Sequence, residues 1–291
     1  MIAVKLLYYP GCTVKRNALE YEKASIAVLE KLGIGVIELD KWYCCGALYS
    51  LAIDDLMKHL GAVRTLVKAQ VQSRDTGTNN LLTICPMCFN VLKRVNKLLI
   101  ENPDNLETIS RFMDEEEEYK AGINVYHIVE ILANNVDRIK ENMVRELGDV
   151  KIAVYYGCTL LRPKEIAVDD PERPQIVENL IKKLNGKTVD YPFKSECCGS
   201  YQVLVNRDIV YNKSKLIINE ASIRGADLIV TVCPLCYYNL KITLNNLKKP
   251  PKIEIVYISE LLAYLLGLDT VLPPETKELF ENVFSCVRKN V

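Results

Sequence analysis

The sequence contains one cysteine pattern twice, and this duplication constrains the fold more than any other feature. In each copy a Gly-Cys-Thr tripeptide is followed by a Cys-Cys-Gly triplet and then by a Cys-Pro-x-Cys motif. These motifs are separated by 31 and 39 residues in the first copy and by 38 and 34 residues in the second. Ten of the eleven cysteines fall into the two five-thiol modules, which are Cys12, Cys44, Cys45, Cys85 and Cys88, and Cys158, Cys197, Cys198, Cys233 and Cys236.

The composition is that of an ordinary globular protein with enough apolar residues for two cores. The chain has 291 residues, of which 49% are hydrophobic and 25% are charged. Domains usually hold about 100–200 residues, so we expect two. Basic and acidic residues number 37 each, which argues against bulk electrostatic binding to nucleic acid or to an anionic membrane.

The cysteines are expected to face a reducing environment. No apolar run reaches the roughly 18 residues needed to span a bilayer. The segment Met1 to Pro10 lacks a cleavage site of small residues and is typical of a first strand, not of a signal peptide. We therefore expect a cytoplasmic protein, in which metal binding or redox chemistry explains cysteines better than disulfides do.

Apolar, β-rich runs alternate with helical patterns in the same order in both halves. This order predicts an α/β fold of two tandem pseudo-symmetric domains, 1–149 and 150–291, each with a small, mostly parallel sheet flanked by helices. A C-terminal helix at 273–289 either docks a partner or packs on the chain itself. The expected strands are Ile2–Tyr9, Ile34–Leu39, Leu81–Ile84 and Ile123–Tyr126, then Lys151–Tyr156, Thr188–Tyr191, Leu228–Val232 and Ile253–Tyr257.

The cysteine groups all follow predicted strands. Ligand sites of such sheets gather at the carboxyl ends of the strands. We therefore expect the five thiols of each module to meet at one sheet edge.

Five thiols exceed the need of a common metal site. A structural zinc ion and a cubane iron–sulfur cluster each take four protein ligands. Two adjacent cysteines can bind two different iron atoms more easily than they can both bind one small ion. The pattern therefore favours an enlarged or open iron–sulfur cluster. Zinc in one or both modules and metal-free thiol chemistry stay open as alternatives. Cys286 lies outside the pattern, and we expect it to pack within the C-terminal helix.

These motifs resemble those of the CCG-domain family, and two modules in one chain resemble its members that are the B subunits of heterodisulfide reductases from methanogenic archaea. The resemblance implies that each module holds one noncubane 4Fe-4S cluster through its five cysteines. It also implies a cytoplasmic oxidoreductase of methanogenesis that reduces the heterodisulfide of coenzyme M and coenzyme B to two thiols, by delivery of one electron from each cluster. The implied partners are the ferredoxin-like C subunit and the flavin-bearing A subunit of such a reductase.

A repeated arginine suggests how the anionic ends of that substrate are held. Gly-Cys-Thr-x-x-Arg occurs at Arg16 and at Arg162, and a guanidinium suits bidentate binding of sulfonate or phosphate. The two arginines could instead offset cluster charge or form surface ion pairs. Lys15, Lys164 and Lys194 are weaker candidates. His59, on the polar side of a helix, and His127 lie outside the duplicated pattern, so we expect structural roles for both rather than proton donation.

Two other functions remain compatible with the sequence. One is an electron-transfer subunit of a lactate, glycolate or glycerol-phosphate oxidising complex. The other is an interaction scaffold stabilised by zinc. No Gly-x-Gly-x-x-Gly or Walker motif follows a strand, so any electrons must come from partner proteins.

Overall fold

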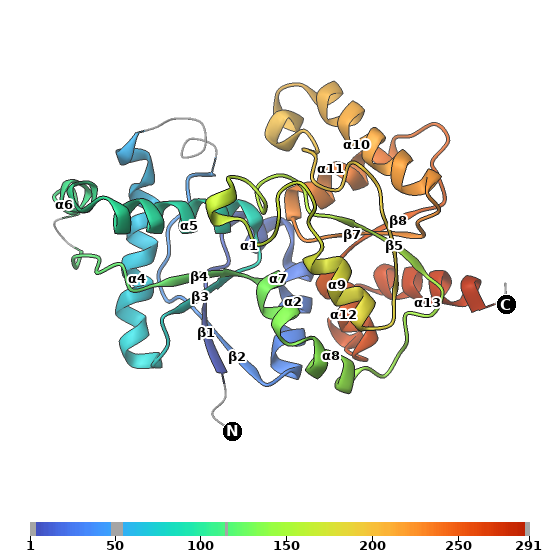
Figure 1. Ribbon diagram of the computed structural model, residues 1–291, viewed down its shortest axis with the longest axis horizontal. Helices are drawn as coiled ribbons and strands as arrows, with labels where there is room; N and C mark the ends of the chain where they lie inside the picture. Colours follow the sequence, from blue (N-terminus) through green and yellow to red (C-terminus); the bar gives the residue numbers. More distant parts are fainter. Residues whose placement is uncertain (1–3, 48–54, 114–115, 289–291) are drawn as a thin grey trace.

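The computed structural model describes residues 4–47, 55–113 and 116–288, without the side chains of residues 286–288. The expected packing of Cys286 therefore lies outside the described residues. The chain forms two tandem halves, each with a four-stranded parallel sheet flanked by helices, which confirms the predicted fold class (Figure 1).

The first half is built on a sheet in the order β2-β1-β3-β4. Every neighbouring pair is parallel, so each connection must cross over a face of the sheet, and helices provide most of these crossovers. The elements are β1 (Val4–Tyr8), α1 (Cys12–Asn17), α2 (Leu19–Lys31), β2 (Ile34–Glu38), the 3-10 helix η1 (Leu56–His59), α4 (Leu60–Thr76), β3 (Asn80–Thr83), α5 (Pro86–Glu101), α6 (Pro103–Ser110), β4 (Asn124–His127), α7 (Ile128–Asn134) and α8 (Val136–Asn142).

The second half repeats this topology with the order β6-β5-β7-β8. All four residues of β7 are buried, as expected for a central strand covered on both faces. The elements are β5 (Lys151–Tyr155), η2 (Lys164–Ile166), α9 (Ile176–Lys183), β6 (Lys187–Val189), η3 (Ser200–Leu204), α10 (Arg207–Ile223), β7 (Leu228–Thr231), α11 (Pro234–Asn245), β8 (Glu254–Tyr257), α12 (Ile258–Leu265), η4 (Asp269–Val271) and α13 (Pro274–Arg288).

The two halves pack reciprocally. Helix α2 of the first half lies on α12 of the second, and α9 of the second half lies on α7 of the first. Because α2 matches α9 and α7 matches α12 in the repeat, the same kind of contact is made twice. One apolar core runs through both halves, and a smaller cluster fills the rest of the second half. We keep the boundary near Gly148–Asp149 as a proposal, in the connection between α8 and β5.

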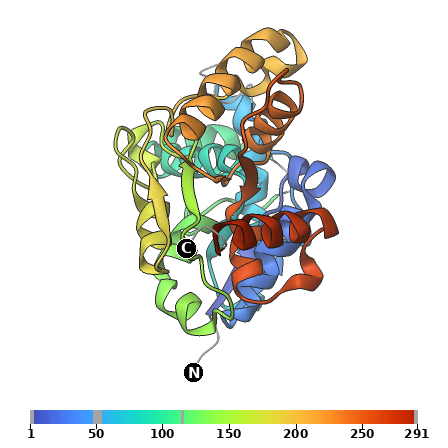
Figure 2. The same cartoon turned by 90° about the vertical axis from the view of Figure 1, so that its right-hand side faces the viewer.

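Helix α13 packs on its own chain. Phe280 and Phe284 are buried, and both rings stack on Tyr264 of α12. Figure 2 shows this helix on the outer side of the second half. Part of its apolar face is thus packed on the chain itself, and docking of a partner on this helix stays a prediction.

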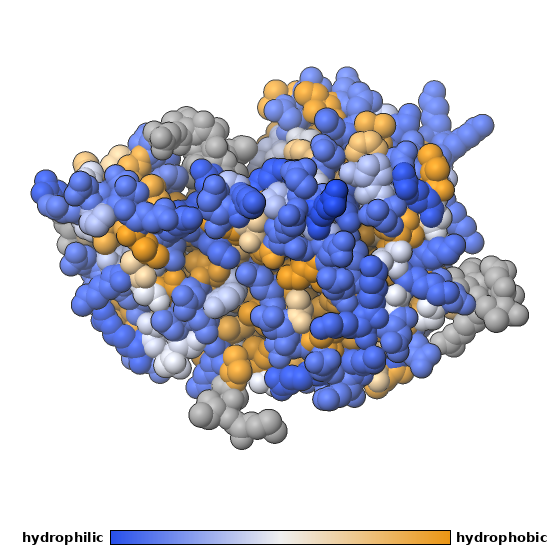
Figure 3. Space-filling view, viewed as in Figure 1, coloured by the Kyte–Doolittle hydropathy of each residue, from blue (hydrophilic) through white to orange (hydrophobic). Residues whose placement is uncertain are grey.

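The surface is largely polar, with exposed apolar side chains near the upper edge of the second half (Figure 3). Leu204 and Val205, just before α10, are 78% and 87% exposed. None of the described helices combines the length and apolar character needed to cross a bilayer.

Candidate functional site

Both cysteine modules lie at the carboxyl ends of parallel strands. Cys12 follows β1 and starts α1, while Cys85 follows β3 and caps the start of α5. The pair Cys44–Cys45 lies in the loop after β2. Proline at the first position of α5 and of α11 suits a helix start, because that position needs no backbone N–H donor.

The thiols of the first module form a connected series. The Sγ atoms of Cys12 and Cys44 are 3.8 Å apart, and those of Cys45 and Cys88 are 3.6 Å apart. Thiol contacts between Cys44 and Cys45, and between Cys85 and Cys88, complete the series. All five thiols therefore meet at one edge of the first sheet.

The second module repeats this series. The Sγ atoms of Cys198 and Cys236 are 3.7 Å apart. Cys197 contacts both Cys158 and Cys198, and Cys236 also contacts Cys233. Tertiary structure thus brings each predicted quintet together, as free thiols.

The glycine before the first cysteine of each module makes room for a thiol. Gly11 and Gly157 have φ angles of 74° and 69°, which favour glycine. A Cβ atom on Gly11 would lie 2.8 Å from Sγ of Cys88, and one on Gly157 would lie 2.9 Å from Sγ of Cys236. Any side chain at these positions would collide with the thiol group. This steric limit explains why glycine precedes the first cysteine of each module.

Two matched tyrosines fix the loops that carry the cysteine pairs. Tyr9 and Tyr155 each precede the first cysteine of their module by three positions. The Tyr9 hydroxyl donates to the carbonyl of Tyr43 at 2.9 Å, and the Tyr155 hydroxyl donates to the carbonyl of Glu196 at 2.7 Å. Each acceptor is the residue directly before the adjacent cysteines, so the same bond positions both pairs.

A third tyrosine joins the two modules. The hydroxyl of Tyr21 lies 3.0 Å from the carbonyl oxygen of Ile84 and 3.0 Å from that of Val232. These residues directly precede Cys85 and Cys233, so one buried hydroxyl sits between the two Cys-Pro-x-Cys motifs.

Tyr201 also connects the halves. It belongs to η3 of the second half, yet burial and the nearby thiols of Cys85 and Cys45 raise its pKa above the ordinary range. Together with the Tyr21 contacts, this places the Cys-Pro-x-Cys segments of both modules next to the interface between the halves.

The thiol contacts favour thiolate formation at Cys45 in the first module and at Cys197 and Cys233 in the second. Hydrogen bonds from Cys44 and Cys88 lower the pKa of Cys45 to about 4. Hydrogen bonds from Cys158 and Cys198 lower the pKa of Cys197 to about 2, and a hydrogen bond from Cys236 lowers the pKa of Cys233. The thiolate is the form that binds metals, so each module contains a thiol whose surroundings favour that form.

The first module has an open side. Cys12 and Cys44 are exposed, whereas Cys45, Cys85 and Cys88 are buried. In the second module Cys158 and Cys197 are half-buried. The first cysteine of each module and the first of each pair thus face solvent, and the remaining thiols face the protein.

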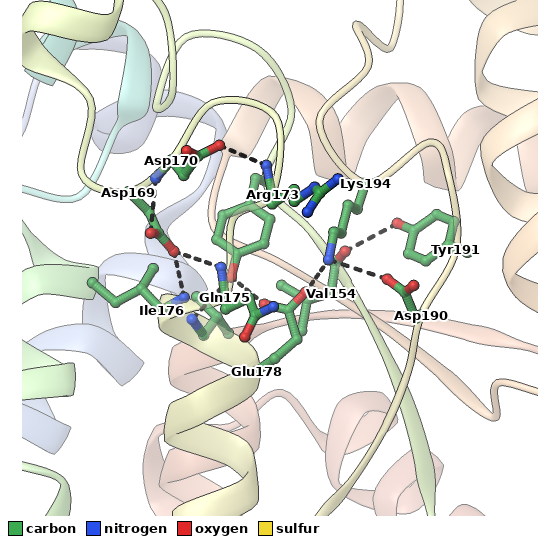
Figure 4. Close-up of polar contacts among 12 residues, drawn as sticks. Val154, Asp169, Asp170, Arg173, Gln175, Ile176, Glu178, Asp190, Tyr191 and Lys194 are labelled. Atoms are coloured by element: carbon green, nitrogen blue, oxygen red, sulfur yellow. Dashed lines mark hydrogen bonds and ion pairs between the residues drawn. The ribbon is translucent and has the colours of Figure 1, made fainter.

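Polar contacts hold the segment before Cys197 in place (Figure 4). The backbone carbonyl of Lys194 accepts hydrogen bonds from Tyr156 N at 2.9 Å and Gly157 N at 3.3 Å. The Lys194 ammonium pairs with Glu178 at 3.1 Å and Asp190 at 3.2 Å. This network connects the backbone segment before Cys197 to the backbone segment before Cys158.

The two repeated arginines differ in their surroundings. Arg162 donates to the carbonyl of Ser195 at 2.9 Å and pairs with Glu172 at 3.2 Å. Arg16 is exposed, and within the described part of the chain it has no hydrogen bond or ion pair. Lys15 pairs with Glu22 and Glu38, so it is already engaged.

The two histidines are both buried. The prediction that His59 lies on the polar side of a helix was wrong, because its side chain is 8% exposed within η1. Burial lowers the pKa of His127 to about 3, so its ring is neutral. Its Nε2 lies 3.3 Å from the Ile84 carbonyl, and Nδ1 accepts from Val129 N at 3.4 Å, consistent with the expected structural role.

Sequence reasoning missed Tyr9, Tyr155 and Tyr21 as supports of the site. The tyrosines at the same offset from Cys12 and Cys158 carried a signal that could have identified them. Tyr21 has no such signal, because its acceptors belong to two different halves.

The donor set of each module fits a cluster better than a single ion. The thiols form two connected series of five, and Gly11 and Gly157 make room for Sγ of Cys88 and Cys236. Soft thiolates in this number suit iron–sulfur chemistry.

Comparisons with known proteins agree with this site. The model of the CCG family, described as a cysteine-rich domain, matches residues 6–93 and 152–241. The B subunit of the ferredoxin/F(420)H(2)-dependent CoB–CoM heterodisulfide reductase of Methanosarcina acetivorans is 30% identical over 287 residues, covering 96% of this chain and 93% of the relative. The membrane anchor subunit of the 8-methylmenaquinol:fumarate reductase of Wolinella succinogenes is 28% identical over 267 residues, covering 90% and 92%.

A solved structure shares the fold. A hypothetical protein from Helicobacter pylori superposes with a TM-score of 0.67 at 14% identity, covering 91% of this chain and 51% of that one. The duplicated motifs, the two matching regions and the relatives agree. The chain belongs to the CCG family of cysteine-rich domain proteins, carries two CCG modules, and is homologous to the B subunits of heterodisulfide reductases and to related anchor subunits.

Proposed function

We propose that this chain is the catalytic iron–sulfur subunit that reduces the heterodisulfide of coenzyme M and coenzyme B to the two thiols. One observation carries the proposal: two complete five-thiol modules meet at one interface, where the Tyr21 hydroxyl joins them. Opening an S–S bond takes two electrons and leaves two sulfur atoms. A pair of like sites on either side of an interface matches that requirement.

The ten module cysteines would hold two noncubane 4Fe-4S clusters. Cys12, Cys44, Cys45, Cys85 and Cys88 form the first ligand set, and Cys158, Cys197, Cys198, Cys233 and Cys236 form the second. Clusters bound there would supply one-electron transfer and iron positions open to a substrate sulfur.

The chain's own residues would prepare the site. Gly11 and Gly157 let the backbone approach the thiols, while Tyr9 and Tyr155 fix the cysteine pairs. These contacts hold the ligand loops in place before anything binds.

Arg16 would bind an anionic end of the substrate. It is exposed, lies on the same short helix as Cys12, and has no acidic partner among the described residues. Arg162, the second proposed anchor, is bound to Ser195 and Glu172, so its guanidinium has fewer free donors. Arg16 would therefore bind an anionic group of the substrate more strongly than Arg162 would.

The proposed partners are the ferredoxin-like C subunit and the flavin-bearing A subunit of a heterodisulfide reductase. The names of the relatives support assembly, since they are subunits of reductase complexes. No electron source belongs to this chain in the proposal.

A second candidate is an electron-transfer subunit of another oxidoreductase. The Wolinella succinogenes relative, which is named as the anchor of a fumarate reductase, covers as much of this chain as several heterodisulfide reductase relatives do. In that function the two modules would form a relay with no substrate between them.

Metal analysis and electron paramagnetic resonance of anaerobically purified protein separate these functions. Iron and sulfide, with a paramagnetic signal that appears only after addition of coenzyme M or coenzyme B thiol to oxidised protein, would support the reductase. Iron and sulfide without that response would support the relay. Zinc without sulfide would overturn both and leave the scaffold. Cys45→Ser should lose one module's iron, whereas Cys286→Ser, outside the pattern, should retain all of it.

A further inference from the structure

The side chain of Asn239 contacts a thiol of the second module. Asn239 lies in α11, three residues after Cys236, and is fully buried. Its Nδ2 atom donates to Sγ of Cys198 at 3.2 Å and to the carbonyl oxygen of Ser200 at 3.0 Å. The amide thus contacts both a ligand sulfur and the turn that follows the cysteine pair.

The orientation of this amide follows from its partners. A carbonyl oxygen only accepts hydrogen bonds, so the atom facing Ser200 must be the nitrogen. Its second hydrogen then points to Cys198. The amide oxygen of Asn239 is buried without a hydrogen-bond partner, which shows that the nitrogen contacts determine how the side chain sits.

The first module has an asparagine at a similar place with a different role. Asn90 lies in α5, two residues after Cys88, and is also buried. Its Nδ2 donates to the carbonyls of Thr159 at 2.7 Å and Arg162 at 2.6 Å, across the interface. Within the described residues, no side-chain amide donates to a thiol of the first module.

The backbone donors around the cysteine pairs are matched between the halves. Backbone amides of Gly46 and Ala47 donate to the first pair, and those of Gly199 and Ser200 donate to the second. The side-chain donors differ. The second cysteine of the first pair, Cys45, has a hydrogen bond from the Tyr9 hydroxyl, whereas Cys198 of the second pair has one from the Asn239 amide.

A hydrogen bond from N–H to a ligand sulfur stabilises the more negative, reduced state of a metal centre and raises its reduction potential. The effect is large in a buried site, where water does not screen the contact. We propose that Asn239 raises the reduction potential of the metal centre held by the second module. This inference rests on the proposed iron–sulfur centres.

Loss of this donor would make the centre of the second module harder to reduce and would leave the centre of the first module unchanged. Asn239 is in this sense a positioning residue, because it acts through a ligand sulfur.

The test is a redox titration of the metal-loaded protein, followed by its absorbance and paramagnetic signals. Asn239→Leu keeps the approximate volume and removes the donor. We expect two redox transitions in the unmodified protein and a negative shift of one of them in the variant. The expected size is at least a tenfold change in the one-electron equilibrium constant, which is about 59 mV. Asn90→Leu is the matched control and should move neither transition.

Three outcomes would overturn the inference. They are a variant with both transitions unmoved, an equal shift of both, or an equal shift in the Asn90→Leu control. Unmodified protein without iron and sulfide would instead refute the proposed function itself, and metal content measured beforehand separates the two failures.

A second measurement needs no variant. Protein labelled with nitrogen-15 in asparagine side chains should show a nitrogen coupling to one metal centre in pulsed paramagnetic resonance. Absence of that coupling in loaded protein would refute the contact even where Asn239→Leu fails to fold.

Discussion

Tyr21 of the first half stacks on Tyr257 of the second, with ring centroids 4.2 Å apart and planes inclined by 17°. Tyr237 stacks on the other face of Tyr257 at the same distance. The Tyr21 hydroxyl then reaches the carbonyls that precede Cys85 and Cys233. One side chain thus joins the packing of the interface to the position of both cysteine modules.

Removing the hydroxyl should weaken both modules. Tyr21→Phe keeps the stacked ring but removes the one O–H that the buried carbonyls of Ile84 and Val232 share, and the Ile84 carbonyl keeps its contact with Nε2 of His127 at 3.3 Å. We expect the free energy of unfolding to fall by about 1–3 kcal/mol, the usual cost of an unsatisfied buried polar group. Hydrogen exchange should accelerate in both Cys-Pro-x-Cys segments.

Tyr191→Phe is the matched control for this change. Tyr191 is buried, and its hydroxyl donates only to the carbonyl of Val154, within the second half, at 3.1 Å. Exchange should then accelerate in the second half alone. If the Cys85 segment exchanges hydrogen at the same rate in Tyr21→Phe and in Tyr191→Phe, the bridging role of Tyr21 is contradicted.

A methyl group at Gly11 should displace the first module. Gly11→Ala places Cβ against Sγ of Cys88, where the added atom would lie 2.8 Å away. We expect the protein to fold but to lose iron from one of its two modules. Gly77→Ala is the control, since Gly77 has a similar φ of 71° and nothing within 4 Å of the added atom. If both variants lose iron equally, backbone strain and not the thiol contact is the cause.

The stability should depend on pH through Glu260. Burial raises the pKa of this carboxyl from 4.5 to about 7, although it accepts a hydrogen bond from Tyr257 N. Between these two pH values the folded state binds more protons than the unfolded state, so stability falls as pH rises and levels off above about pH 7. The full change is on the order of 3 kcal/mol.

Glu260→Gln should flatten this dependence and raise the melting temperature above pH 7. The glutamine keeps an acceptor for the start of α12 while removing the charge. Glu130→Gln changes the carboxylate at the matching helix start, which pairs with Lys93 at 3.6 Å, and should retain the wild-type slope. A Glu260→Gln variant with the wild-type slope would rule out this carboxyl as the source.

The repeated arginines should respond differently to the same change. Arg16→Gln should raise KM for the heterodisulfide about tenfold or more, since a hydrogen bond to a charged group contributes about 1.5–3 kcal/mol. Its melting temperature should not change. Arg162→Gln should lower the melting temperature, because it loses the contacts with Ser195 and Glu172. Unchanged KM in Arg16→Gln would refute its role as an anchor.

The sequence predicted the sheets and the meeting of the cysteines well, because both depend on local signals. Apolar β-rich runs ended at cysteines, and parallel strands bring such ends to one edge. The helical stretch between Cys12 and Lys31 consists of two helices, α1 and α2, divided at Ala18 with a φ of −148°. No glycine or proline marks that break, so residue pattern alone gives no sign of it.

Features that depend on tertiary contacts were harder to anticipate. The ion pairs of the acidic run before residue 119 are an example: Glu117 and Glu118 are exposed, while Glu116 and Glu117 pair with Lys68 and Arg74 of α4. Asn90 lies two residues after Cys88 and Asn239 lies three residues after Cys236, so the two side chains leave their helices in different directions. Their partners, the carbonyls of the other half for Asn90 and a thiol for Asn239, follow only from the tertiary structure.

The reciprocal contacts of α2 with α12 and of α9 with α7 have a consequence for ancestry. They form an internal dimer interface, in which each repeat covers the helix that the other would leave bare. A shorter polypeptide with one repeat would have to self-associate to hide those helices. Fusion of two such copies would have kept this contact while allowing each copy to diverge, and the position of Asn239, which is Val91 in the first copy, is one such divergence.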